Sequence, residues 1–138
     1  MSQTAILWPM IAHAALVYII YVLMFFRRKA AVQAGSARIS QFRENRDEPA
    51  ESLFVRNNLS NQFELPVLFH ACCLALLAAG AVGWAAVALA WVFSLSRYIH
   101  AFVHVTSNRI RYRQPAFSLG FLAVAIMWIL LAVHLAAA

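Results

Sequence analysis

Charged side chains are scarce in this sequence: they make up only 12% of its 138 residues, against a hydrophobic fraction of 64%. A soluble domain of this length needs far more charge to cover its surface. The composition therefore excludes a soluble protein and predicts an integral membrane protein with one domain. Basic residues outnumber acidic ones by 11 to 5, but they flank long apolar runs, which argues against a nucleic-acid partner.

Cysteine is also rare and is limited to the adjacent pair Cys72 and Cys73, inside an apolar run. Neighbouring side chains on a helix point about 100° apart, so these two cannot easily form a disulfide with each other. We interpret both as small buried hydrophobic residues. The pair therefore says nothing firm about the redox compartment.

The apolar runs predict an all-α bundle of four transmembrane helices, because about 20 helical residues cross a hydrocarbon core of about 30 Å. The run over residues 65–96 is too long for one span, and Gly80 and Gly83 are the natural place to divide it. The second helix is expected to run without a break from Pro49 to about residue 79. A hydrophilic loop is predicted over residues 27–52. The predicted spans cover residues 5–26, 60–80, 84–106 and 116–138.

Basic residues are concentrated in two of the connections. Seven of the 11 lie between Arg27 and Arg56, three lie between Arg109 and Arg113, and the last is Arg97. Four crossings place both basic connections on the same side, and the positive-inside rule makes that side the cytoplasm. Both termini are then predicted to lie outside.

A polar face is predicted where the second helix enters the membrane. Asn57, Asn61 and Glu64 recur at helical spacings of four and three, so we expect them to share one face. Residues 65–82 directly after them contain no Asp, Glu, Lys or Arg. Ionisable groups at this depth are costly, and a functional site is the default hypothesis for them.

A second polar stripe, formed by Arg97, His100 and His104, lies in the cytoplasmic half of the third helix. Three interpretations are open. Arg97 and Glu64 could form a structural ion pair. The two histidines could bind zinc, although no HExxH motif is nearby, and no metal site is predicted. Alternatively, the residues form a pocket for an anionic peptide-like ligand, because arginines bind carboxylates and carboxamides bind peptide groups. The isolated His13 and His134 are interpreted as packing residues.

Two stretches resemble motifs of a known membrane family. The segment Asn61-Gln-Phe-Glu64-Leu-Pro66, preceded by Arg56 or Asn57, resembles an Arg-x-x-x-Asn-x-x-Glu motif on the family's second helix. The segment Arg97-Tyr-Ile-His100-x-x-x-His104 resembles its third-helix Arg-x-x-His-x-x-x-Tyr stretch. The family is the membrane-associated proteins in eicosanoid and glutathione metabolism (MAPEG), and the chain is most similar to its short bacterial members.

The resemblance implies a homotrimer that binds glutathione between neighbouring subunits and carries out transfer or peroxide reduction on lipophilic molecules. It also implies a bacterial inner membrane, which makes both termini periplasmic. Arg113 would activate the thiol, with Arg111 as the rival position. The implied glutathione contacts are Arg28, Arg56, Asn57, Asn61, Glu64, Arg97, His100 and His104.

The chain departs from the family pattern at three places. The motif arginine is displaced, because Asn57 stands four residues before Asn61 and Arg56 stands five before it. His104 replaces the usual tyrosine, and Phe117 stands where some members carry another tyrosine. The alternative function is therefore a non-catalytic, lipid- or partner-binding member of the same family.

Overall fold

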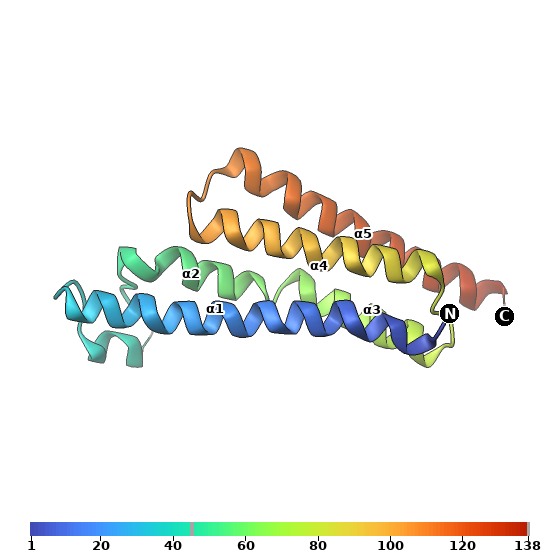
Figure 1. Ribbon diagram of the computed structural model, residues 1–138, viewed down its shortest axis with the longest axis horizontal. Coiled ribbons are helices and arrows are strands. Elements are labelled where there is room, and N and C mark those ends of the chain that lie inside the picture. Colours follow the sequence, from blue (N-terminus) through green and yellow to red (C-terminus); the bar gives the residue numbers. More distant parts are fainter. Residues whose placement is uncertain (45, 138) are drawn as a thin grey trace.

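The structure is a computed structural model that describes residues 1–44 and 46–137 (Figure 1). Two residues of the predictions lie outside the described residues: Asn45 in the hydrophilic loop and Ala138 at the end of the fourth predicted span. The elements, in chain order, are η1 (Gln3–Ile6), α1 (Leu7–Gln33), η2 (Ile39–Arg43), α2 (Ala50–Asn61), α3 (Leu65–Ala78), α4 (Trp84–Val105) and α5 (Ile110–Ala137).

Four helical stretches are long and apolar enough to cross a membrane. They are Gln3–Gln33, Ala50–Ala78, Trp84–Val105 and Ile110–Ala137. The described chain contains no strand. The predicted all-α, four-span architecture is therefore confirmed, and the protein is an integral membrane protein.

Two glycines in the left-handed conformation end α1 and α3. Gly35 has φ +77°, and the amide of Ser36 donates to the carbonyl of Ala31 over 3.0 Å. Gly80 has φ +64°, and the amide of Ala81 donates to Leu76 over 2.8 Å. Both turns show the backbone pattern that glycine favours after a helix, because it has no Cβ to clash. The predicted division of the long apolar run is thus where the chain turns.

The second span is not one continuous helix, so that prediction was wrong. α2 ends at Asn61 and α3 begins at Leu65. Pro66, in the first turn of α3, has no N–H to donate and its ring would collide with the carbonyl four residues earlier. The amide of Gln62 donates instead to Leu59 over 3.0 Å, a tighter turn. Glu64 therefore lies outside α2, and the expected common helical face with Asn57 does not exist.

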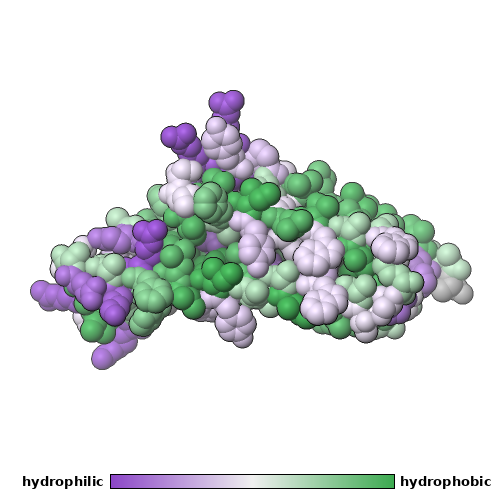
Figure 2. Space-filling model, in the orientation of Figure 1, coloured by the Kyte–Doolittle hydropathy of each residue, from purple (hydrophilic) through white to green (hydrophobic). Residues whose placement is uncertain are grey.

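The helices form an elongated bundle with both termini at one end (Figure 1). The α3–α4 turn lies at the same end, whereas the α1–α2 and α4–α5 connections lie toward the other. On the face drawn in Figure 2, most hydrophilic residues gather around these two connections, and apolar or weakly polar residues cover most of the rest. The arrangement agrees with two basic connections on the same side of a membrane.

The main apolar core lies between α3, α4 and α5, beside η1. Cys72 and Cys73 are both fully buried in it, as expected for small hydrophobic residues. Other members of this core are Phe69, Leu76, Ala86, Ala90, Phe93, Ala123, Val124 and Met127.

Candidate functional site: a buried arginine–histidine cluster

Arg97, on α4, has a fully buried side chain with 0% exposure. Its Nη2 donates to the backbone carbonyl of Asn61 over 3.4 Å. Its Nε and Nη1 have no hydrogen-bond partner among the residues that the structure describes. A guanidinium removed from water is unfavourable unless its charge and its N–H groups are matched. The planar guanidinium can donate two parallel hydrogen bonds to a carboxylate or a phosphate group.

His104, one turn further along α4 than His100, contacts two residues of α2. Its Nδ1 accepts from Nδ2 of Asn58 over 3.3 Å and lies 3.5 Å from Nδ2 of Asn61. The rings of His100 and His104 meet edge to face, with centroids 5.6 Å apart. Nδ1 of His100 is buried and has no partner within the described chain. We call Arg97, His100, His104, Asn58 and Asn61 the arginine–histidine cluster.

Asn58, rather than Asn57, turns inward from α2. Asn58 is 0% exposed, whereas Asn57 is exposed. The motif comparison singled out Asn57 because it stands four residues before Asn61. Adjacent residues on a helix face directions about 100° apart, so a shift of one position changes which side chain points into the core.

Glu64 is exposed in the single chain and does not pair with Arg97. Within the described residues, the ion pairs are Arg28–Glu48, Arg46–Glu44 and Arg56–Glu48. The interpretation of Arg97 and Glu64 as a structural ion pair is therefore wrong for the chain as the structure describes it. The cause is the break before Pro66, which carries Glu64 off the face of α2.

Phe117, on α5, closes one side of the arginine–histidine cluster. Its ring centroid is 5.9 Å from Cζ of Arg97 and 5.9 Å from the ring centroid of His100. Four residues before it, Arg113 is half-buried and donates from Nη1 to Oδ1 of Asn108. Arg111 is exposed. Of the two candidate thiol-activating arginines, only Arg113 therefore has its side chain partly enclosed by the protein.

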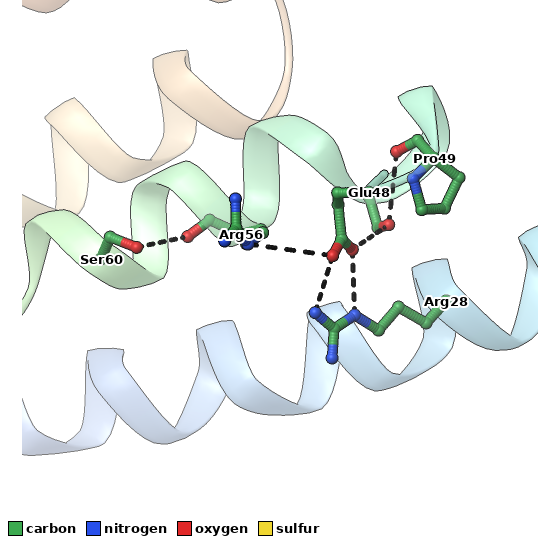
Figure 3. Close-up of polar contacts among 6 residues, drawn as sticks. Arg28, Glu48, Pro49, Arg56 and Ser60 are labelled. Carbon is green, nitrogen blue, oxygen red and sulfur yellow. Dashed lines mark hydrogen bonds and ion pairs between the residues drawn. The ribbon is translucent and has the colours of Figure 1, made fainter. Parts of the chain in front are cut away.

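Arg28 and Arg56 meet at Glu48, which the sequence analysis had not singled out (Figure 3). Arg28 donates from Nε and Nη2 to the two carboxylate oxygens over 2.9 and 2.8 Å. Ser52 donates to the same carboxylate, and Nε of Arg56 lies 3.9 Å from it. This group ties the end of α1 to the start of α2. The predicted role of these arginines as glutathione contacts stays a prediction.

A second buried polar group lies between α1 and α3, and sequence reasoning missed it. Nδ1 of His13 is 3.0 Å from Nε2 of His70, and Nε2 of His13 is 3.1 Å from Oε1 of Gln62. Gln62 also donates from Nε2 to Oδ1 of Asn58 over 3.1 Å. Because Asn58 contacts His104, hydrogen bonds run without interruption from His70 to His104. His13 was interpreted from the sequence only as a packing residue, and His70 and Gln62 were not singled out, because contacts between residues far apart in the chain leave no pattern in the sequence.

No group of three or more His, Cys, Asp or Glu within residues 1–44 and 46–137 is placed to hold a metal ion. Two cavities adjoin α1. One of about 590 Å³ is lined by Tyr21, Met24, Phe25, Arg28, Lys29, Val32, Gln33, Ile39 and Phe42. The other, of about 470 Å³, is lined by His13, Ala14, Val17, Tyr18, Tyr21, Gln62, Phe63, Val67 and His70.

The fold and these polar groups define a small four-span membrane protein with a cationic cluster enclosed by its helices. The sequence model of the MAPEG family matches residues 5–133, nearly the whole chain. The chain therefore belongs to the MAPEG family, and the resemblance noted in the motifs is confirmed. Neither the comparison with curated proteins nor the comparison with solved structures gave a match.

Proposed function

We propose that this protein is a membrane-bound, glutathione-dependent transferase or peroxidase that acts on lipophilic substrates. The observation that carries the proposal is the buried guanidinium of Arg97, whose Nε and Nη1 have no partner in the described chain. A desolvated cation with unmatched N–H groups favours a carboxylate ligand. Glutathione is a small peptide with two carboxylates, and the chain belongs to a family named for glutathione metabolism.

Arg97 would bind a carboxylate of glutathione, and His100, His104 and Asn61 would bind its other polar groups. Asn57 and Glu64 are exposed on the protomer, which suits contacts made across a subunit boundary. We therefore propose a homotrimer with glutathione between neighbouring subunits. We also propose that it lies in a bacterial inner membrane with both termini in the periplasm.

Arg28 and Arg56 are already held by Glu48. They would contribute mainly positive charge near the glutathione site, whereas Arg97 would contribute N–H groups that donate hydrogen bonds to the ligand. Their contribution to affinity would then be smaller than that of Arg97, because charges that are partly exposed and partly compensated attract a ligand weakly.

When bound, glutathione supplies a thiol that reacts as a thiolate. A free thiol has a pKa of about 8.5, so only a few per cent is ionised at neutral pH. A nearby guanidinium stabilises the anion without itself losing a proton. Arg113 is the candidate for this role because it is half-buried, whereas Arg111 is exposed.

Two observations favour a second candidate, a non-catalytic lipid-binding protein. Phe117 lies against Arg97 and His100 where a tyrosine hydroxyl is found in some family members, so a possible proton donor is missing there. The cavity of about 590 Å³ combines an apolar wall with Arg28 and Lys29. An apolar cavity with basic residues beside it suits an anionic lipid.

Binding of glutathione to the purified protein in nanodiscs tests the first proposal. Arg97→Met should weaken binding about 30- to 150-fold, because it removes charge-assisted hydrogen bonds worth about 2–3 kcal/mol. The matched control Arg111→Met, at an exposed position, should bind like the wild type. Equal affinity of wild type and Arg97→Met would contradict the role given to Arg97.

The role of Arg113 has a separate readout. Bound glutathione should show thiolate absorbance near neutral pH, and Arg113→Leu should abolish the absorbance and the turnover of a lipophilic electrophile while glutathione still binds. If Arg111→Leu abolishes them and Arg113→Leu does not, Arg111 is the activating residue. If glutathione binds to neither the wild type nor the variants, the lipid-binding function replaces the enzymatic one.

A further inference from the structure

The cavity of about 470 Å³ between α1 and α3 has a polar floor that the proposed glutathione site does not use. His13 and Gln62 are buried at its base, with 1% and 3% exposure, and His70 is half-buried beside them. The remaining lining residues are apolar or aromatic. Pockets of a few hundred Å³ with apolar walls and a few polar groups are typical of sites for small molecules.

The direction of each hydrogen bond follows from Gln62. Its Nε2 donates to Asn58, so its Oε1 must accept the hydrogen bond from Nε2 of His13. A neutral His13 then has Nδ1 as an acceptor, and Nε2 of His70 must be the donor to it over 3.0 Å. Charging either imidazole in an apolar surrounding would be costly, so both are treated as neutral.

His70 consequently has its lone pair on Nδ1. This atom has no hydrogen-bond partner in the part of the chain that the structure describes, although the side chain lines the cavity. A ligand that satisfies it must donate a hydrogen bond. A hydroxyl group does so, whereas an ether or an ester offers only acceptors.

The charge and the exposure of the walls narrow the ligand class further. None of the described lining residues is Asp, Glu, Lys or Arg, so an ion in this cavity would be desolvated without a counter-charge. Tyr18, Phe63 and Val67 are 73%, 57% and 55% exposed. The cavity is therefore open at the side of the bundle, where a lipid-dissolved molecule can enter.

We propose that this cavity is a second binding site, for an uncharged lipophilic molecule with one hydroxyl group, a phenol or a long-chain alcohol, which donates to Nδ1 of His70. The occupied site continues the hydrogen-bond chain through His13, Gln62 and Asn58 to His104 in the arginine–histidine cluster. The proposal goes beyond the glutathione site, and its test requires no glutathione.

Binding of 4-octylphenol to the protein in nanodiscs tests the proposal, with its methyl ether, 4-octylanisole, as the probe that lacks the donor. The two probes have nearly the same apolar body, so they differ chiefly in the hydroxyl hydrogen. The wild type should bind the phenol about tenfold more tightly than the ether, because the ether leaves Nδ1 of His70 unsatisfied. Equal affinities, or no saturable binding of the phenol, would overturn the proposal.

Three variants separate the site from general partitioning into the bilayer. His70→Phe should abolish the preference for the phenol, whereas His134→Phe, the same change at an exposed residue of α5, should retain it. Val67→Trp should block both probes by filling the cavity while leaving the hydrogen-bond chain intact. This second variant tests the site even if the His70→Phe protein does not fold. Undiminished phenol binding by Val67→Trp would place the ligand elsewhere and overturn the proposal.

A spectroscopic measurement reports the hydrogen bond itself. In protein labelled with ¹⁵N-histidine, 4-octylphenol should shift the Nδ1 resonance of His70 while its Nε2 remains protonated. 4-Octylanisole should not shift that resonance. A phenol that binds without moving the His70 resonance would contradict the assigned donor–acceptor contact.

Discussion

Glu48 shows how one carboxylate can organise the basic end of the bundle. Its side chain is 3% exposed and accepts two hydrogen bonds from Arg28, at 2.9 and 2.8 Å, and one from Ser52. Burial alone raises the pKa of this carboxyl group. The hydrogen bonds from Arg28 and Ser52 and the positive charges of Arg28 and Arg56 outweigh that effect, so the pKa of Glu48 lies below its ordinary value of 4.5.

The lowered pKa of Glu48 leads to a pH-dependent prediction. The ionised group stabilises the folded state above its unfolded pKa of 4.5, and this contribution is lost as the pH falls through the lower folded pKa. Glu48→Gln should reduce the free energy of unfolding by about 2 kcal/mol at pH 7, because it removes charge-assisted hydrogen bonds. Below about pH 4.5 the difference from the wild type should shrink.

Unfolding in denaturant at several pH values measures this effect. The matched control is Glu44→Gln, since the Glu44 side chain is 62% exposed and pairs only with the 79% exposed Arg46. It should change stability little at any pH. A loss in Glu48→Gln that stays constant down to pH 3 would show that the charge of Glu48 is not responsible.

The candidate site could be predicted from the sequence only in part. The spacing of Arg97, His100 and His104 correctly predicted one polar stripe, because α4 is a regular helix. Asn58 was missed because a shift of one residue along α2 changes which side chain faces α4. His70 was missed because its partner, His13, lies on another helix 57 positions away, and such a contact leaves no pattern in a single sequence.

Gly120, on α5, lies where α5 approaches α4 closely. A Cβ added at Gly120 would lie 2.6 Å from Oγ of Ser96 and 3.4 Å from Cδ2 of Phe93. Oγ of Ser96 is buried and donates to the carbonyl of Phe93 over 2.7 Å. The hydroxyl therefore cannot move away without losing its hydrogen bond in a buried place.

Gly120→Ala should consequently separate α4 from α5 or displace Ser96, at a cost of about 1–3 kcal/mol. The double variant Gly120→Ala with Ser96→Ala should recover most of the loss, because the atom that collides is gone. Thermal or denaturant unfolding of the two single variants and the double variant measures the coupling. Additive effects would show that the two side chains do not meet.

The break between α2 and α3 could have been predicted from a proline in the sequence. Pro66 predicts an interruption, but the uncharged run after Glu64 favoured one long span. The break leaves the carbonyl of Asn58 without its usual helical partner, and the side chain of Gln62 donates to it over 3.3 Å. Gln62 directly follows α2 and also contacts His13, 49 positions away in the chain. Helical periodicity carries no signal for a contact between residues so far apart.

For the whole molecule, the number of spans and the position of the two basic connections could be predicted because both depend on composition over many residues. A run of about 20 apolar residues is a strong signal. The proposed homotrimer would depend instead on a few contacts between protein surfaces, for which a single sequence carries no comparable pattern.

The orientation in the membrane is the remaining whole-molecule prediction. Ten of the 11 basic residues lie in or beside the α1–α2 and α4–α5 connections, which the structure places away from both termini (Figure 1). The positive-inside rule then puts Ser36 and Ser107 in the cytoplasm and Ser2 outside. All three serines are exposed, and the natural Cys72 and Cys73 are fully buried, so an introduced cysteine should dominate labelling.

In intact cells a membrane-impermeant maleimide should label Ser2→Cys but not Ser36→Cys or Ser107→Cys. Both of the latter should react after permeabilisation, which controls for their accessibility. Labelling of Ser36→Cys and Ser107→Cys from outside intact cells would reverse the topology and turn the proposed glutathione site away from the cytoplasm.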